Sequence, residues 1–307
     1  MTVVLDVDAY GADARRSAIA DFVELAAFRR PISRNELSDY VRDCGLAVPP
    51  PRLVTLGDDV GEASMADDDP PIVSQRVFDL LAERSRRLGT LYPFSLESTV
   101  LTRTAPDVMT TYDATLAMTI RHAYFEDSTI PELFEDFVCR SLRASSMTVF
   151  PLSYRVRATD GFGVERFGGV LDEARGALNL APATGGLVSR AVHDGSVDVL
   201  ARHPPTDSRP GFWTLLCQVT VGKTTLWETK LKNRKLRSWS HYLGDPLPPL
   251  FCVAVPHHVE PWHLESLVID SEGATVLDRL RLVASGVIAS ESEQALARSL
   301  IEGGAEF

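Results

Sequence analysis

The stretch "WTLLCQVTVGKTTLWETK", residues 213–230, decides the fold and raises the main functional question. Its first half is an apolar run typical of a buried strand, but Gln218 interrupts that run. Its second half carries lysines on a segment with a helical pattern. An unpaired amide in a buried strand costs on the order of 1–3 kcal/mol, so we expect Gln218 to have a hydrogen-bond partner or a ligand.

The neighbouring segments complete a pattern of helices and strands. Apolar runs at 195–203 and 249–256 are typical of strands. A helix fits 131–142, because a proline stands at its first position and acids fill its first turn, and another is expected at about 225–242. The order helix, strand, strand, helix, strand predicts an α/β (α+β) fold, with a central mixed β-sheet flanked by helices.

The chain is expected to divide at a linker. Residues 1–47 hold two short helices, the second of which begins with a capping box made by Ser33 and Glu36. We predict an N-terminal helical unit there, suited to a protein partner or to packing. Residues 48–71 are rich in proline, glycine and acid, as in a linker or mobile loop. Residues 72–307 form the second predicted domain, which ends in an α-rich C-terminal tail.

Composition sets broad limits on the class of protein. The 307 residues are 45% hydrophobic and 24% charged, as in ordinary globular proteins, and they contain no apolar run long enough for a membrane span. Because the first residues also lack the pattern of a secretion signal, we expect a cytoplasmic protein with no membrane partner. The four cysteines are scattered along the chain. We therefore expect buried free thiols, and neither a zinc site nor disulfides.

The net charge of −11 disfavours a nucleic-acid partner, but the charge is unevenly distributed. Residues 1–70 hold 14 acids and 7 bases, whereas residues 223–237 hold six bases and one acid. The second segment is a candidate phosphate-binding face, and a solvated helix surface is the alternative. Its predicted nucleic-acid-binding residues are Lys223, Lys232, Arg234, Lys235 and Arg237.

Three polar residues interrupt apolar segments: Glu135 in the helix, Asp198 between two valines, and Gln218. If the two strands are adjacent, Asp198 and Gln218 present oxygens side by side, and Mg²⁺ accepts such oxygens together with water and phosphate. Acids near a helix start are also ordinary partners of the helix dipole, so Glu135 has a structural alternative. The pair His257 and His258 follows a strand, and we expect it to be an exposed loop feature.

These residues, in this order and on these elements, resemble the PD-(D/E)xK nuclease superfamily, which has the restriction-endonuclease-like fold. The resemblance is strongest to the Mrr-type branch, where a glutamate on the first core helix precedes an aspartate on one strand and glutamine-x-lysine on the next. Here "LFEDFV" supplies Glu135, "SVDVLA" supplies Asp198 and "LLCQVTV" supplies Gln218. The resemblance covers a core at about residues 130–256.

The motif lysine is missing, because the position two after Gln218 is Thr220. Members of the superfamily can carry that lysine on the following helix, where this chain has Lys230. Lys223, in the intervening turn, is the second candidate.

The resemblance implies metal-dependent hydrolysis of phosphodiester bonds, of DNA first and of RNA as an alternative. Asp198, the side-chain oxygen of Gln218 and the main-chain carbonyl of Val219 are the implied ligands of Mg²⁺ or Mn²⁺. Lys230 is the implied residue that orients the attacking water, and Glu135 assists it. The resemblance further implies an effector of bacterial anti-phage defence, and cutting of both strands would favour a homo-oligomer.

Two alternatives remain open. With Thr220 in place of the lysine, the chain can be a catalytically inactive nuclease-like fold that binds nucleic acid or scaffolds a protein complex. It can also be an acidic helical adaptor whose strands are only core.

Overall fold

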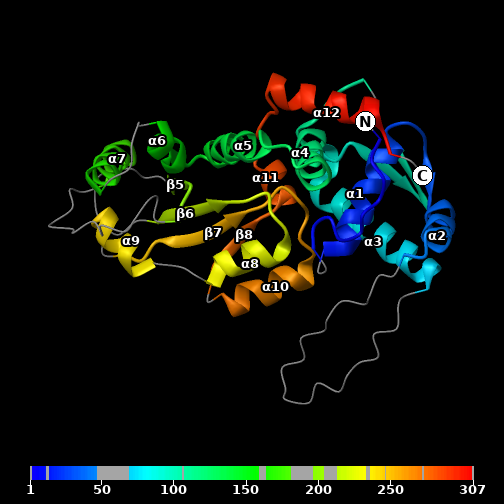
Figure 1. The fold of residues 1–307 in the computed structure, drawn as a ribbon, viewed down its shortest axis with the longest axis horizontal. Helices are drawn as coiled ribbons and strands as arrows, with labels where there is room; N and C mark the ends of the chain where they lie inside the picture. The colour runs from blue at the N-terminus through cyan, green and yellow to red at the C-terminus, as the bar shows by residue number, and fades with distance from the viewer. Residues whose placement is uncertain are drawn as a thin grey trace, which may run out of the picture.

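The structure is a computed structural model, which describes residues 2–11, 14–46, 69–105, 107–158, 164–180, 196–203, 213–232, 236–245, 247–271 and 273–305. It combines helices with two open β-sheets, one near each end of an elongated molecule (Figure 1). The predicted α+β class is confirmed.

The larger sheet has five strands in the order β4-β5-β6-β7-β8. The first three strands are antiparallel, and β6, β7 and β8 are parallel. Their bounds are Thr148–Pro151, Val199–Arg202, Thr214–Val219, Leu250–Ala254 and Thr275–Leu277. The three runs predicted from the sequence contain β5, β6 and β7, each shorter than its run. The edge strands β4 and β8 were not predicted, since three or four residues carry too little alternation to distinguish a strand from a loop.

Helices cover both faces of this sheet. Its strands place alternate side chains on opposite sides, and apolar side chains on both sides are buried against helices. On β5, Val199 and Ala201 lie in the core formed with helix α5, while Leu200 lies in the core on the other side. The helices are α5 (Ile130–Ala144) on the first face and, on the second, α6 (Leu152–Ala158), α7 (Val164–Ala177), α8 (Thr224–Lys232), α9 (Leu236–Leu243) and α10 (Pro261–Asp270). The single helix predicted over 225–242 is therefore two helices.

A smaller three-stranded sheet, in the order β1-β3-β2, shares a core with the first helices. Ser33 begins α2 as predicted: its hydroxyl accepts from Glu36 N at 3.2 Å, and Glu36 Oε2 accepts from Ser33 N at 2.8 Å. The elements are α1 (Arg15–Ala27), β1 (Ile32–Ser33), α2 (Arg34–Asp43), α3 (Pro70–Leu88), η2 (Gly89–Leu91), β2 (Phe94–Glu97) and β3 (Val100–Arg103). Residues 47–68, which hold most of the predicted linker, lie outside the described residues, so that boundary stays a prediction.

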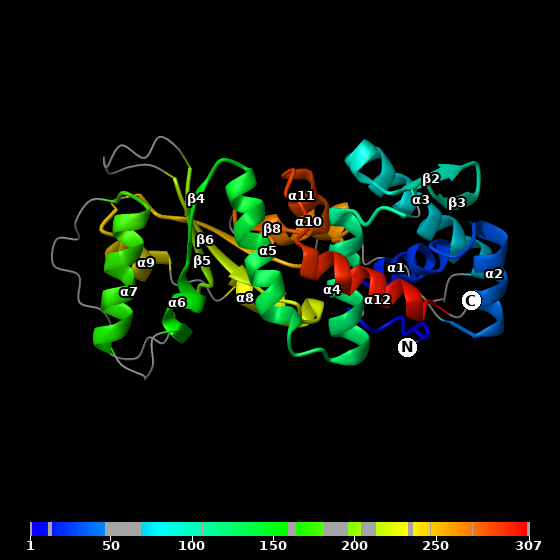
Figure 2. The same ribbon diagram turned by 90° about the horizontal axis from the view of Figure 1, so that it is seen from above.

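Three further helices lie between the two sheets, as Figure 2 shows: α4 (Thr111–Phe125), α11 (Arg279–Ala284) and α12 (Glu291–Gly303). Helix α11 contacts α3, α4, α5 and β8, and α12 packs along α4. Of the cysteines, Cys139, Cys217 and Cys252 are buried as expected, but Cys44 at the end of α2 is exposed. In the ranges described, no helix is both long enough and apolar enough to cross a membrane.

A buried network of ion pairs joins the N-terminal helices to α11. Asp21 on α1 accepts hydrogen bonds from Arg84 Nη1 at 2.8 Å and from Arg279 Nη2 at 2.7 Å. Glu24, one turn along α1, lies 2.9 Å from Arg84 Nη1 and accepts from the Tyr112 hydroxyl at 2.8 Å. All four charged side chains are essentially inaccessible to solvent. Helix α1 is therefore enclosed on every side.

Candidate active site

Asp198 is held against the end of β6. It stands one residue before β5, and its backbone N donates to the Cys217 carbonyl at 3.0 Å. Its side chain turns back along β6, where Oδ2 accepts from Val219 N at 2.7 Å. The carboxylate is only half-buried. The strands bearing Asp198 and Gln218 are thus adjacent, as the sequence analysis required.

Gln218 and Val219 lie where β6 leaves the core. The register pairs Val199 with Cys217 and ends there, and Asp198 N bonds to the Cys217 carbonyl, so Gln218 directly follows the last residue of β6 that is paired with β5. Cys217 packs on the α5 side of the sheet and Leu216 on the other, so alternation places Gln218 on the Leu216 side. Both Gln218 and Val219 are half-buried. The Gln218 amide therefore keeps part of its contact with water, which a fully buried side chain in a strand would lose.

Lys230 reaches this end of β6 from helix α8. Its Nζ lies 3.5 Å from the Val219 carbonyl oxygen, and its side chain is half-buried. Two fully buried residues, Trp227 and Leu231, fix α8 in the core beside it. The structure thus brings Asp198, Val219 and Lys230 together, whereas Lys223 is exposed in the turn before α8.

Thr220 has a local structural role at the position of the missing lysine. Its backbone N donates to the Ala254 carbonyl at 3.0 Å, and its hydroxyl accepts from Gly222 N at 3.3 Å. These bonds shape the turn that leads from β6 into α8.

Glu135 is connected to Asp198 through Ser153, a residue that the sequence analysis missed. Glu135 is 7% exposed, and its Oε1 accepts from the Ser153 hydroxyl at 2.8 Å. The backbone N of Ser153 donates to the Asp198 carbonyl at 3.0 Å. Arg157 Nη2 also donates to Glu135 Oε2 at 3.0 Å. A glutamate that only interacted with the helix dipole would need none of these contacts. Here Ser153 connects Glu135 to Asp198, the residue before β5.

The predicted basic face is described only in part. Arg234 and Lys235 lie outside the described residues, as do the side chains of Lys232 and Arg237. Their role in nucleic-acid binding stays a prediction.

The oxygen types at this site are those that a hard divalent cation prefers. Mg²⁺ and Mn²⁺ bind carboxylate, amide and carbonyl oxygens, and Asp198, Gln218 and the Val219 carbonyl supply one of each at neighbouring backbone positions. Among the described residues, His, Cys, Asp and Glu nowhere form a group of three or more that can hold a metal ion. A metal held here would depend on the amide and carbonyl oxygens as well as on Asp198.

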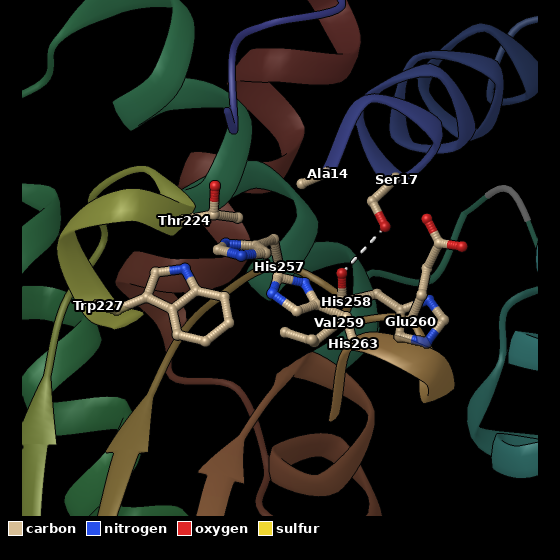
Figure 3. A pocket seen from close by; sticks show the side chains of 9 residues that line it. All are labelled: Ala14, Ser17, Thr224, Trp227, His257, His258, Val259, Glu260 and His263. Atoms are coloured by element: carbon tan, nitrogen blue, oxygen red, sulfur yellow. Dashed lines mark hydrogen bonds between the residues drawn. The ribbon is translucent and has the colours of Figure 1, made fainter. Parts of the chain in front are cut away.

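His257 and His258 are buried, at 2% exposure each, so the prediction of an exposed loop was wrong. They line a small pocket formed by α1, α8 and the segment that leads into α10 (Figure 3). The Ser17 hydroxyl on α1 donates to the His258 carbonyl at 3.0 Å. Burial and the Arg279 guanidinium lower the pKa of His257 to about 3, so this ring is neutral at physiological pH.

Three buried polar atoms of this pocket have no hydrogen-bond partner among the described residues: Thr224 Oγ1, Trp227 Nε1 and His257 Nε2. They belong to side chains that are at most 2% exposed. A buried polar group without a partner costs about 1–3 kcal/mol. A water molecule or polar ligand that bonded these atoms would therefore stabilise the folded protein.

Gly11 in the N-terminal segment lies against Thr224 of this pocket. The substitution Gly11→Ala is expected to lower the free energy of unfolding by about 2–3 kcal/mol. Gly11 has φ +104°, and an added Cβ would lie 2.4 Å from Thr224 Oγ1. Gly45→Ala is the matched control, because Gly45 has φ +59° and nothing within 4 Å of such a Cβ. Chemical denaturation of both variants measures the difference. Equal losses would show that the contact with Thr224 relaxes freely.

Comparisons of this chain with protein-family models, with curated proteins and with solved structures find no match.

Proposed function

We propose that this protein is a metal-dependent nuclease that hydrolyses phosphodiester bonds of DNA. The observation that carries the proposal is the meeting of Asp198, Val219 and Lys230 at the end of β6. The order of elements also supports it: helix α5, the antiparallel strands β4, β5 and β6, helix α8 and the parallel strand β7 occur in this order, with α6 and α7 inserted after β4 and α9 after α8. This is the order expected of a restriction-endonuclease-like core.

Each residue has a role that its position supports. Asp198, Gln218 and the Val219 carbonyl would hold Mg²⁺ or Mn²⁺, which when bound supplies positive charge to polarise the scissile phosphate. The Lys230 ammonium, a donor of three hydrogen bonds, orients water and stabilises negative charge that develops on the phosphate. Glu135, fixed by Ser153, lies on the far side of Asp198 as an acceptor for a proton or for water.

Purified protein is expected to cleave DNA with Mg²⁺ or Mn²⁺, and chelation is expected to abolish the cleavage. Asp198→Ala and Lys230→Ala should each reduce the rate at least about a hundredfold, because each removes a charge that acts on the reacting phosphate. Asp172→Ala on α7, whose carboxylate is 74% exposed, is the matched control and should cleave as wild type does. The readout is cleavage of linear and circular DNA, and of RNA, on gels.

Two results would change the proposal. If Lys223→Ala abolishes cleavage and Lys230→Ala does not, the lysine of the turn takes the catalytic role. Absence of cleavage by wild type with every metal and substrate, together with retained DNA binding, would favour the second candidate, a nuclease-like fold that only binds. The feature in favour of that candidate is Thr220, whose hydroxyl serves the turn in place of a motif lysine.

A further inference from the structure

Helix α6 runs directly alongside the candidate site. It follows β4, and its first residues, Leu152 and Ser153, are buried, while Val156 packs against the core. Tyr154, Arg155 and Arg157 are exposed. Ser153 and Arg157, one turn apart on this short helix, both contact Glu135, while Tyr154 and about half of the Arg157 side chain are exposed to solvent.

Arg157 bonds to Glu135 and Ser153 and is still half-exposed to solvent. Its Nη2 donates to Glu135 Oε2 at 3.0 Å, and its Nη1 donates to the Ser153 hydroxyl at 2.9 Å. Its Nε lies 3.9 Å from Glu132 Oε1, and the side chain is 47% exposed. A guanidinium has five N–H donors in a planar fork, so these two hydrogen bonds leave donors for an acceptor outside the protein.

The bond to the buried Glu135 carboxylate has a structural reason, because a buried charge needs a partner. The remaining donors of the Arg157 guanidinium, whose side chain is 47% exposed, are not needed for that bond. Those remaining donors suit a phosphate, since the planar fork of a guanidinium matches phosphate oxygens. The overall charge of −11 repels DNA, so contact with a backbone requires local cations of this kind.

We propose that the exposed side of α6 contacts the DNA phosphate backbone, and that Arg157 binds a phosphate next to the scissile one while it positions Glu135. Tyr154, which is 58% exposed, packs on the adjacent sugar or base. The inference rests on the proposed nuclease function.

The test measures binding of a fluorescently labelled DNA duplex by anisotropy over a range of salt concentrations, with Ca²⁺ in place of Mg²⁺. Arg157→Gln is expected to weaken binding on the order of tenfold. It should also lower the slope of log affinity against log salt by about 0.9, the value for one lost phosphate contact. Arg157→Lys, which keeps the charge, should recover part of the affinity.

The matched control is Arg298→Gln. Arg298 is exposed on α12, which lies far from α6 in both views of the fold (Figures 1 and 2), and the charge change is the same. If Arg157→Gln and Arg298→Gln bind alike while wild type binds and cleaves, the inference is wrong and the nuclease proposal stands. Wild type that neither binds nor cleaves DNA overturns both. Thermal unfolding of each variant verifies that the fold is intact.

Discussion

Replacing Asp21 by alanine is expected to lower the free energy of unfolding by about 3–5 kcal/mol, because it leaves the buried Arg279 without its main counter-charge and Arg84 with Glu24 alone. Asp21 accepts from Arg84 and Arg279, and it also accepts from the Tyr10 hydroxyl at 2.8 Å. Burial by itself raises the pKa of Asp21, but Arg279 and Arg84 outweigh it and lower that pKa to about 2. The carboxylate is therefore charged at neutral pH.

Equilibrium denaturation by urea measures this loss. Asp8→Ala is the control, since Asp8 pairs with Arg15 at 2.6 Å but is 51% exposed, and its loss should cost less than about 1 kcal/mol. Tyr10→Phe removes a single hydrogen bond to Asp21, with an expected cost of about 1 kcal/mol, and it reports on the network if Asp21→Ala does not fold. A loss for Asp21→Ala no larger than that for Asp8→Ala would contradict the prediction.

Acidification from about pH 7.5 to about pH 5 is expected to destabilise the protein by about 2 kcal/mol through His257 alone. The pKa of His257 is about 3 in the folded protein, against 6.5 for an unperturbed histidine. Between these values the unfolded chain binds more protons than the folded one, so stability falls as the pH falls. Burial, Arg84 and Arg279 also lower the pKa of His258, which therefore acts in the same direction.

Buried carboxylates whose pKa is raised in the folded protein oppose this loss of stability on acidification. Burial raises the pKa of Glu24, so the folded protein takes up a proton there more readily than the unfolded chain does, and this offsets part of the loss. The decisive measurement is therefore the difference in pH dependence between wild type and His257→Gln, which removes the titrating ring. The variant should lose about 2 kcal/mol less between the two pH values. Identical pH dependence would show that His257 titrates normally in the folded protein.

Local features of the fold could be predicted from the sequence. The capping box at Ser33 and the helix opened by Pro131 both follow from residues within one or two turns of each other. Short edge strands could not be predicted, because β4 and β8 are held by pairing with strands that lie far along the chain.

The candidate site could be predicted in part, for the same reason. Asp198, Gln218 and Glu135 were recognisable because each places a polar group among apolar neighbours. Ser153 and Arg157 stand in a short, mixed segment, and nothing in its pattern shows that it packs beside Glu135. The segment "YRVR" was the one available signal, since it combines an aromatic residue with two arginines.

By itself, the sequence determined which segments become helices and strands around Gln218, and that polar residues would interrupt them. Hydrophobic periodicity, helix caps and prolines act over a few residues, so their effects can be predicted without knowledge of the fold. Only the tertiary structure decided that Lys230 reaches Val219, that His257 is buried, and that Arg279 pairs with Asp21 across 258 positions of sequence. Such contacts depend on how whole elements pack, because a charge can leave water only where distant residues supply its partner.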